Sequence, residues 1–155
     1  MTIASVLVQV STVGWGVLCG AMIYEHLAVV PSWAAAPPAS LHMWTGEYRV
    51  KAERFWMSIH PLLLLLLGAS LVAAWGETAR RDWIGVALGV YAVIIATTAV
   101  WYVPELMKLT RDPAAPIPPD QWRHRARRWE VLSWVRGALV LANAYPILRA
   151  LTVSA

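Results

Sequence analysis

Long apolar segments alternate with shorter polar ones along the whole chain. Apolar residues dominate four stretches, at about residues 3–30, 52–75, 83–105 and 129–151. Each is long enough for a helix that crosses the hydrocarbon core of a bilayer, which needs about 20 apolar residues. Inside lipid, backbone polar groups must be satisfied within the segment, which favours helices. The pattern predicts an all-α, four-helix transmembrane bundle in up-down-up-down order, with residues 1–155 forming a single integral membrane domain.

Composition strengthens this prediction. Hydrophobic residues make up 59% of the 155 residues and charged residues 14%, whereas soluble domains carry about 25% charged residues. The mean hydropathy is +0.53. Cys19 is the only cysteine, which excludes an intrachain disulfide and a cysteine-based metal cluster. The first residues lack a basic stretch and a small-residue cleavage site, so we interpret them as part of a retained span.

Two long polar segments fall at the same end of the predicted bundle. Residues 32–51 are long for a connection between helices, which suggests a lid or a re-entrant piece over the bundle end. Pro31 is expected to end the first helix and Pro104 to kink the third. The second segment, residues 108–128, ends in a basic run that should begin the fourth helix. The short turn at residues 76–82 is expected to be solvated.

Basic residues are distributed unequally between the two sides of the bundle. An even number of spans places both termini on one side. Apart from Arg136, nine Lys and Arg residues fall on the long-loop side and three on the terminal side. Since cytoplasmic loops carry the excess of positive charge, the long loops are predicted to be cytoplasmic, with the bacterial inner membrane as the expected location. We interpret the basic run at residues 123–128 as an anchor to anionic lipid and expect no nucleic-acid binding.

Ionisable residues collect at the long-loop end of the spans. Because the spans alternate in direction, the late ends of spans one and three meet the early ends of spans two and four. Such residues are costly inside a membrane and mark a functional or charge-paired position. Helical spacing also places Thr97, Trp101 and Glu105 on one face of span three. The predicted cluster consists of Glu25, His26, Glu53, His60, Tyr102, Glu105, Glu130 and Arg136.

Three kinds of chemistry could use this cluster. Imidazole and carboxylate groups could bind iron, copper or zinc, with ligands drawn from Glu25, His26, Glu53, His60 and Glu105. Alternatively, His26 and His60 lie at similar depth and could ligate a haem from two sides. In the third hypothesis no cofactor is bound, a histidine or carboxylate acts as a base, and Arg136 stabilises the anion that forms. The catalytic candidates are His26, His60 and Arg136.

The same residues have structural interpretations. Arg136 could pair with Glu25 or Glu105, and Glu53 could pair with a neighbouring basic residue. Ser133 precedes Arg136 by three residues and should lie beside it on the helix. The ten tryptophans fall mostly near predicted span ends, so we interpret the majority as an interfacial belt.

Short motifs occur in a definite order along the chain. Span one ends in Glu25 and His26 followed by Pro31, span three ends in Val-Pro-Glu-Leu at 103–106, and span four contains Trp129 and then Trp-Val-Arg at 134–136. In this order the chain resembles the anthrone-oxygenase-like family of small four-span membrane proteins. The resemblance implies a four-helix membrane protein and, as in some members, oxygenation of anthrones to anthraquinones without an obvious organic cofactor. It carries over to Glu25, His26, Pro104, Trp129 and Arg136.

These observations favour a small, oxygenase-like membrane oxidoreductase. Its substrate would be an apolar or aromatic small molecule that reaches the cluster from the lipid bilayer, and a homo-oligomer is compatible with the sequence. One alternative is a haem-binding membrane protein with His26 and His60 as axial ligands. Another is a non-catalytic binder or assembly subunit, in which the polar cluster is a structural ion-pair network.

Overall fold

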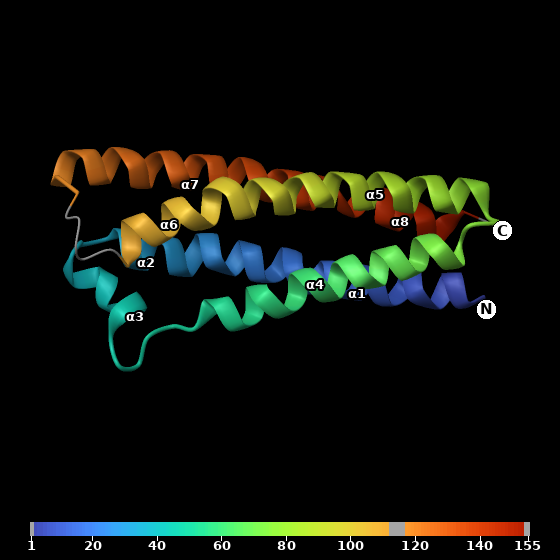
Figure 1. The fold of residues 1–155 in the computed structure, drawn as a ribbon, viewed down its shortest axis with the longest axis horizontal. Helices are drawn as coiled ribbons and strands as arrows, with labels where there is room; N and C mark the ends of the chain where they lie inside the picture. The colour runs from blue at the N-terminus through green and yellow to red at the C-terminus, as the bar shows by residue number, and fades with distance from the viewer. Residues whose placement is uncertain (1, 112–116, 154–155) are drawn as a thin grey trace.

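The fold is an all-α bundle of four long helical rods (Figure 1). The computed structural model describes residues 2–111 and 117–153, and no strand occurs among them. Successive rods run in opposite directions, and both chain ends lie at one end of the bundle (Figure 1). All four rods are long and apolar enough to cross a membrane. The predicted fold class and the up-down-up-down order are thereby confirmed.

Two of the four rods contain a π-helical turn. The rods consist of α1 (Ile3–Tyr24), η1 (Glu25–Val29) and α2 (Val30–Ala34); α4 (Ala52–Ala73); α5 (Thr78–Thr97), η3 (Thr98–Tyr102) and α6 (Val103–Thr110); and α7 (Pro119–Ala142) with α8 (Ala144–Thr152). Helix three begins at Thr78, before its apolar part, because its charged first turns are also helical. Helix four begins at Pro119 and contains the basic run that was predicted to begin it.

Pro31 does not end the first helix, contrary to the sequence-based expectation. In both π-turns the chain keeps its helical course by widening one turn, so that Val30 N–H donates to Glu25 O and Val103 N–H donates to Thr98 O. Each π-turn starts six residues before a proline. A proline ring clashes with the carbonyl four residues earlier, and a wider turn relieves that crowding.

The rods pack through three layers of core residues. α1 packs against α4, α7 and α8, while α5 packs against α4, α7 and α8. Leu63, Leu67 and Tyr91 lie in the middle layer, and Ala4, Ile84 and Ala150 lie in the layer near the chain ends. The third layer, at the long-loop end, is rich in tryptophan.

The tryptophans do not form the expected interfacial belt. Five of the ten are buried, namely Trp15, Trp33, Trp44, Trp122 and Trp129. Three of these donate an indole N–H to a backbone carbonyl: Trp15 to Val140, Trp122 to Leu109 and Trp129 to Tyr102. Their amphipathic rings therefore connect helices inside the bundle.

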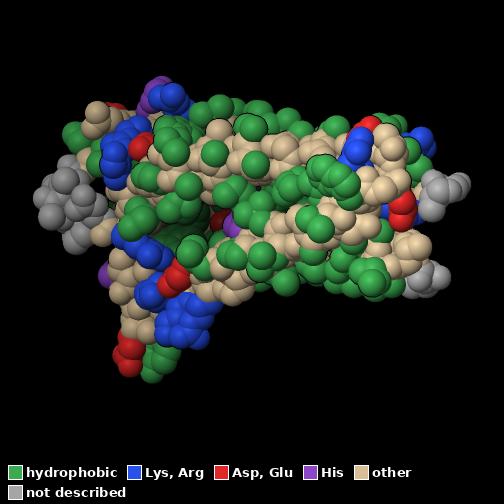
Figure 2. All heavy atoms as spheres, turned by 45° about the vertical axis from the view of Figure 1, so that its right-hand side comes forward, with side chains coloured by type: hydrophobic (Ala, Val, Ile, Leu, Met, Phe, Trp, Pro, Cys, Tyr) green, Lys and Arg blue, Asp and Glu red, His purple; other side chains and the backbone are tan. Residues whose placement is uncertain are grey.

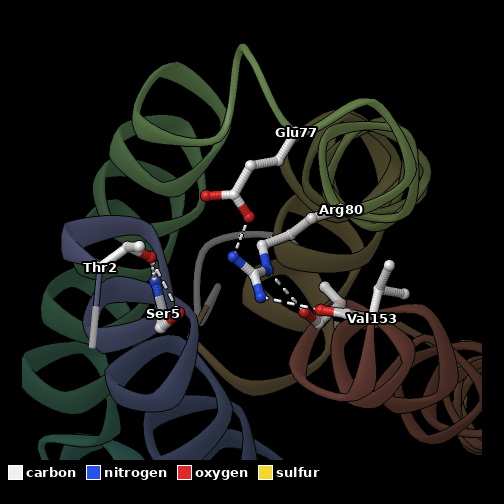
Figure 3. A network of polar contacts seen from close by, with 6 residues as sticks. Thr2, Ser5, Glu77, Arg80 and Val153 are labelled. Atoms are coloured by element: carbon white, nitrogen blue, oxygen red, sulfur yellow. Dashed lines mark hydrogen bonds and ion pairs between the residues drawn. The ribbon is translucent and has the colours of Figure 1, made fainter. Parts of the chain in front are cut away.

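The turn at the terminal end is also more than a solvated connection. Arg80 is 6% exposed, and it bonds to the Glu77 carboxylate. Its Nε donates to Ala150 O at 3.1 Å and its Nη2 to Val153 O at 2.8 Å. Figure 3 shows this guanidinium between the start of α5 and the end of α8. Arg80 thus caps the last helix and closes this end of the bundle.

The first long loop covers the opposite end, as the lid hypothesis expected. It contains a 3₁₀ turn, η2 (Ala39–Leu41), and one short helix, α3 (His42–Thr45). Trp44 of α3 is 5% exposed and packs into the tryptophan-rich layer. Part of the second long loop, residues 112–116, lies outside the described residues.

Candidate functional site

A cavity of about 450 Å³ opens between α4 and the η3–α6 part of the third rod. α4 packs on α1 and α5, whereas α6 packs on α7, so α4 and α6 diverge toward the long loops. Figure 2 shows the hollow ringed by hydrophobic side chains, with acidic and histidine side chains at its inner edge. Its outer rim includes Met57, Val103 and Met107, which are 74%, 45% and 50% exposed. The rim is therefore largely apolar, apart from Glu53 and Arg111, which also line the cavity.

One wall of the cavity follows a strict four-residue spacing. In a regular α-helix each step of four residues turns about 400°, so a row at this spacing drifts by about 40° per step. The π-turn at Thr98–Tyr102 has more residues per turn and offsets part of this drift. The residues on this wall are Ile94, Thr98, Tyr102, Leu106 and Thr110.

The face predicted from regular helical spacing lies elsewhere. Thr97 is exposed and bonds only to carbonyls of its own helix. Trp101 packs edge-on against Tyr102, with the Arg128 guanidinium 5.7 Å from its ring centroid. Thr97, Trp101 and Glu105 do not line the cavity. The cavity face is offset by one residue from the predicted face.

Arg136 supplies the positive charge of the inner wall. Its Nη2 donates to Ser133 Oγ at 3.0 Å, which confirms the predicted neighbour, and its Nη1 donates to Thr98 Oγ1 at 3.3 Å. Its Cζ lies 4.5 Å from the centroid of the Tyr102 ring. Among the described residues, no carboxylate lies within 4.0 Å of this guanidinium. The guanidinium is positioned by neutral groups and keeps donor capacity for a ligand.

Glu25 lies at the start of the first π-turn and also lines the cavity. Its carboxylate is close enough to Arg136 to interact electrostatically without a direct contact. Within the described part of the chain, no side chain or backbone group donates a hydrogen bond to it. Glu25 and Arg136 therefore face the cavity as separate charges of opposite sign.

His60 is the third ionisable group of the inner wall. Its imidazole stacks on Trp56, with ring centroids 5.6 Å apart and an interplanar angle of 22°. Its Nδ1 lies 2.7 Å from the hydroxyl oxygen of Tyr91 on α5. The imidazole is held on both sides, and its Nε2 edge is available to the cavity.

His26 is adjacent to Glu25 in sequence but does not line the cavity. It is 2% exposed, its Nδ1 lies 2.8 Å from Met22 O, and its ring contacts Trp134 at a centroid distance of 4.6 Å. Bis-histidine haem ligation needs two imidazoles facing one cavity. The structure places only His60 there, so the predicted His26–His60 pair is not assembled.

The other predicted carboxylates form ion pairs at the long-loop end. Glu105 makes a bidentate pair with Arg125, with N–O distances of 2.7 and 2.8 Å. Glu53 lies between Arg49 at 2.7 Å and Arg111 at 3.4 Å, at the outer part of the cavity. Glu105 is therefore separated from Arg136, and Glu53 bridges α4 and α6 in the ion-pair role that the sequence also allowed.

The predicted metal ligands are not assembled either. Among residues 2–111 and 117–153, no group of three or more His, Cys, Asp and Glu side chains is arranged to hold a metal ion. The reason lies in their separate partners: His26 faces α7, while Glu53 and Glu105 are paired with arginines. Of the five proposed ligands, Glu25, His60 and Glu53 line the cavity, the last at its outer part.

Two residues of the site are not apparent from the sequence. Thr98 and Tyr91 are ordinary helix residues in an apolar segment, and regular helical counting gives neither a special position. The available signal for Thr98 is Pro104, six residues later, because the same spacing separates Glu25 from Pro31. Tyr91 has no comparable signal.

The inner wall lies nearer to the long-loop ends of the rods than to the ends that carry the chain termini. Rods of 32 and 33 residues are about 50 Å long and exceed the ~30 Å core. Glu25 precedes the end of its rod at Ala34 by nine residues, and His60 follows Ala52 by eight. These intervals correspond to about 12–14 Å. The polar groups of the inner wall therefore lie about two to three helical turns inside the bundle from its long-loop end.

Comparison of the chain with family models, with curated proteins and with solved structures finds no match.

Proposed function

We propose that the protein is a membrane oxidoreductase of the oxygenase type, acting on an apolar aromatic molecule with an acidic C–H or O–H group. The observation that carries the proposal is that Glu25 and Arg136, two groups of opposite charge without a direct contact, line one cavity whose outer rim carries exposed apolar side chains. An apolar substrate partitions into the bilayer and reaches such a mouth sideways. Glu25 and Arg136 then act on the polar group of the substrate.

In this proposal Glu25 is the general base and Arg136 stabilises the anion. For an anthrone, the carboxylate accepts a proton from the methylene carbon opposite the carbonyl, and the electron pair moves to the carbonyl oxygen. The guanidinium binds that developing oxyanion. The carbanionic carbon then reduces O₂ to a bound hydroperoxide. Loss of water gives the quinone, so anthrone and O₂ yield anthraquinone and H₂O.

Two further considerations support this class of reaction. The residues that carry the resemblance to the anthrone-oxygenase-like family include both Glu25 and Arg136. The groups on the inner wall that can donate or accept a proton are the side chains of Glu25, His60 and Arg136. His26, by contrast, has a packing role against Trp134 in this proposal.

We further propose that the protein resides in a bacterial inner membrane with its long loops in the cytoplasm, on the basis of the nine-to-three charge bias. Cys19 can be replaced by Ser and a single cysteine placed at Thr45, which is exposed on α3. A membrane-impermeant maleimide should label this cysteine only after the cells are opened. Labelling of intact cells would reverse the orientation.

The enzyme proposal is tested with protein in nanodiscs and an anthrone that carries phenolic hydroxyls. We expect consumption of one O₂ for each quinone formed, at a rate above that of empty nanodiscs. Glu25→Gln should lower kcat by about 10²- to 10⁴-fold, because the amide cannot accept the proton. The matched control is Glu105→Gln, which changes a carboxylate outside the cavity and should leave kcat unchanged.

Equal loss in both glutamine variants would contradict a specific role for Glu25. Tight binding of the anthrone without any O₂ consumption would favour the non-catalytic binder and overturn the oxygenase proposal.

A further inference from the structure

The inner wall contains one hydrogen bond whose direction follows from burial. The Tyr91 side chain is 0% exposed, and its ring packs edge-on against Trp15 at a centroid distance of 4.8 Å. Its hydroxyl lies 2.7 Å from His60 Nδ1. Across the described part of the chain, no other hydrogen-bond partner of this hydroxyl occurs.

A buried hydroxyl places its proton on an available acceptor, because an unsatisfied buried donor is energetically costly. His60 Nδ1 is the acceptor at hand, so the tyrosine donates and Nδ1 carries no proton. In a neutral imidazole the proton then resides on the other nitrogen. The Nε2–H group of His60 is the edge that is available to the cavity.

We infer that His60 Nε2–H and Arg136 together form a two-donor binding site for an oxyanion, and that Tyr91 is the positioning residue that sets the His60 tautomer. This inference rests on the proposed function and changes the role of His60. The sequence suggested a base or a metal ligand, whereas an Nε2–H tautomer presents a donor. The group bound here is an enolate, phenolate or carboxylate oxygen, and Glu25 is left as the acceptor.

The tautomer can be measured without turnover or ligand. Protein labelled with ¹⁵N-histidine gives long-range ¹H–¹⁵N spectra in which the two neutral tautomers have different patterns. The His60→Gln variant identifies the His60 signals among the four histidines. We expect His60 of the unchanged protein to show the Nε2–H pattern alone. An Nδ1–H pattern would overturn the inference whatever the protein catalyses.

Tyr91→Phe tests the positioning role. The phenyl ring keeps the contact with Trp15 and removes only the hydroxyl, so the His60 signals should change to a mixture of tautomers. Anthrone turnover should fall by about tenfold. In a His60→Gln background, where a side-chain amide can donate without Tyr91, the same change should cost less than twofold.

An unchanged tautomer in Tyr91→Phe, or the same tenfold loss in the His60→Gln background, would show that Tyr91 acts only through packing. If the spectra agree with expectation but no anthrone is oxidised, the proposed function fails while the oxyanion site stands. Titration with an aromatic carboxylate, followed at the His60 Nε2–H signal, then identifies the site directly. Absence of any shift on titration would overturn the oxyanion site.

Discussion

Arg80 and Arg136 are arginines inside the same bundle, near its opposite ends, and they are held in different ways. All three nitrogens of the Arg80 guanidinium have partners: the Glu77 carboxylate, Ala150 O and Val153 O. Arg136 bonds to two neutral hydroxyls, and its Nε has no partner among the described residues.

This difference indicates that Arg80 has a structural role, whereas Arg136 is suited to bind a ligand. A saturated guanidinium with a paired charge fixes the elements around it. A guanidinium held by neutral groups beside a cavity retains both charge and donors. Arg80 is buried and Arg136 only partly buried, but the number and charge of their partners distinguish their roles more directly.

The largest effect on stability is expected at the closed end. Arg80→Met removes the partner of Glu77 and the side-chain donor to the carbonyls of Ala150 and Val153. Loss of one partner of a buried pair destabilises by about 3 kcal/mol or more. Thermal unfolding of helical structure in detergent measures this loss.

The double variant Arg80→Met with Glu77→Gln should recover part of the loss, because no charged carboxylate is then unpaired. Anthrone turnover per folded molecule should be unchanged in both variants. If turnover falls by more than the amount of folded protein does, Arg80 also contributes to catalysis. The contrast between Arg80 and Arg136 would then be smaller than the structure indicates.

For Arg136 we expect the opposite result, namely a small effect on stability and a large effect on turnover. Arg136→Gln keeps a side chain that can bond to Ser133 and Thr98 but removes the charge, so stability should change by less than about 1 kcal/mol. The rate of anthrone oxidation should fall by about 10²- to 10³-fold, the usual cost of one lost oxyanion donor. Unfolding and turnover of the same preparation give both quantities. A strongly destabilised variant with normal turnover of its folded fraction would assign Arg136 a structural role.

A smaller effect is expected at the mouth of the cavity. Val103→Trp places a large ring on the rim, so KM for the anthrone should rise several-fold with little change in kcat. Val100→Trp is the matched control, because Val100 is 79% exposed on the adjoining π-turn of the same rod but does not line the cavity. An equal rise in KM for both variants would point to a general effect on the membrane, and no rise for either would place the substrate path elsewhere.

The fold could be predicted because one physical requirement dominates it. Four apolar segments of membrane length leave few alternatives to a helical bundle, and chain direction alone brings Glu25, His60 and Arg136 to the same end. The position of Thr98 could not be predicted from regular spacing, because the π-turn changes the helical phase by a fraction of a turn. The ion-pair partners could not be predicted from the sequence either. Arg80 has the sequence context of a solvated loop residue, yet it pairs with Glu77. Glu105 pairs with Arg125 and not with Arg136.

The closed end of the bundle limits how a small molecule can enter and leave the cavity. Between the inner wall of the cavity and the chain ends, the described helices are filled by Leu63, Leu67 and Tyr91 and then by Ala4, Ile84 and Ala150, all 2% exposed or less. The Arg80 cap lies at the second of these layers, where its Nε donates to Ala150 O. The cavity is thus closed toward the chain ends, so a molecule that enters must leave between α4 and α6 or at the long-loop end. Such an architecture suits chemistry on a membrane-dissolved molecule and not its passage from one side of the bilayer to the other.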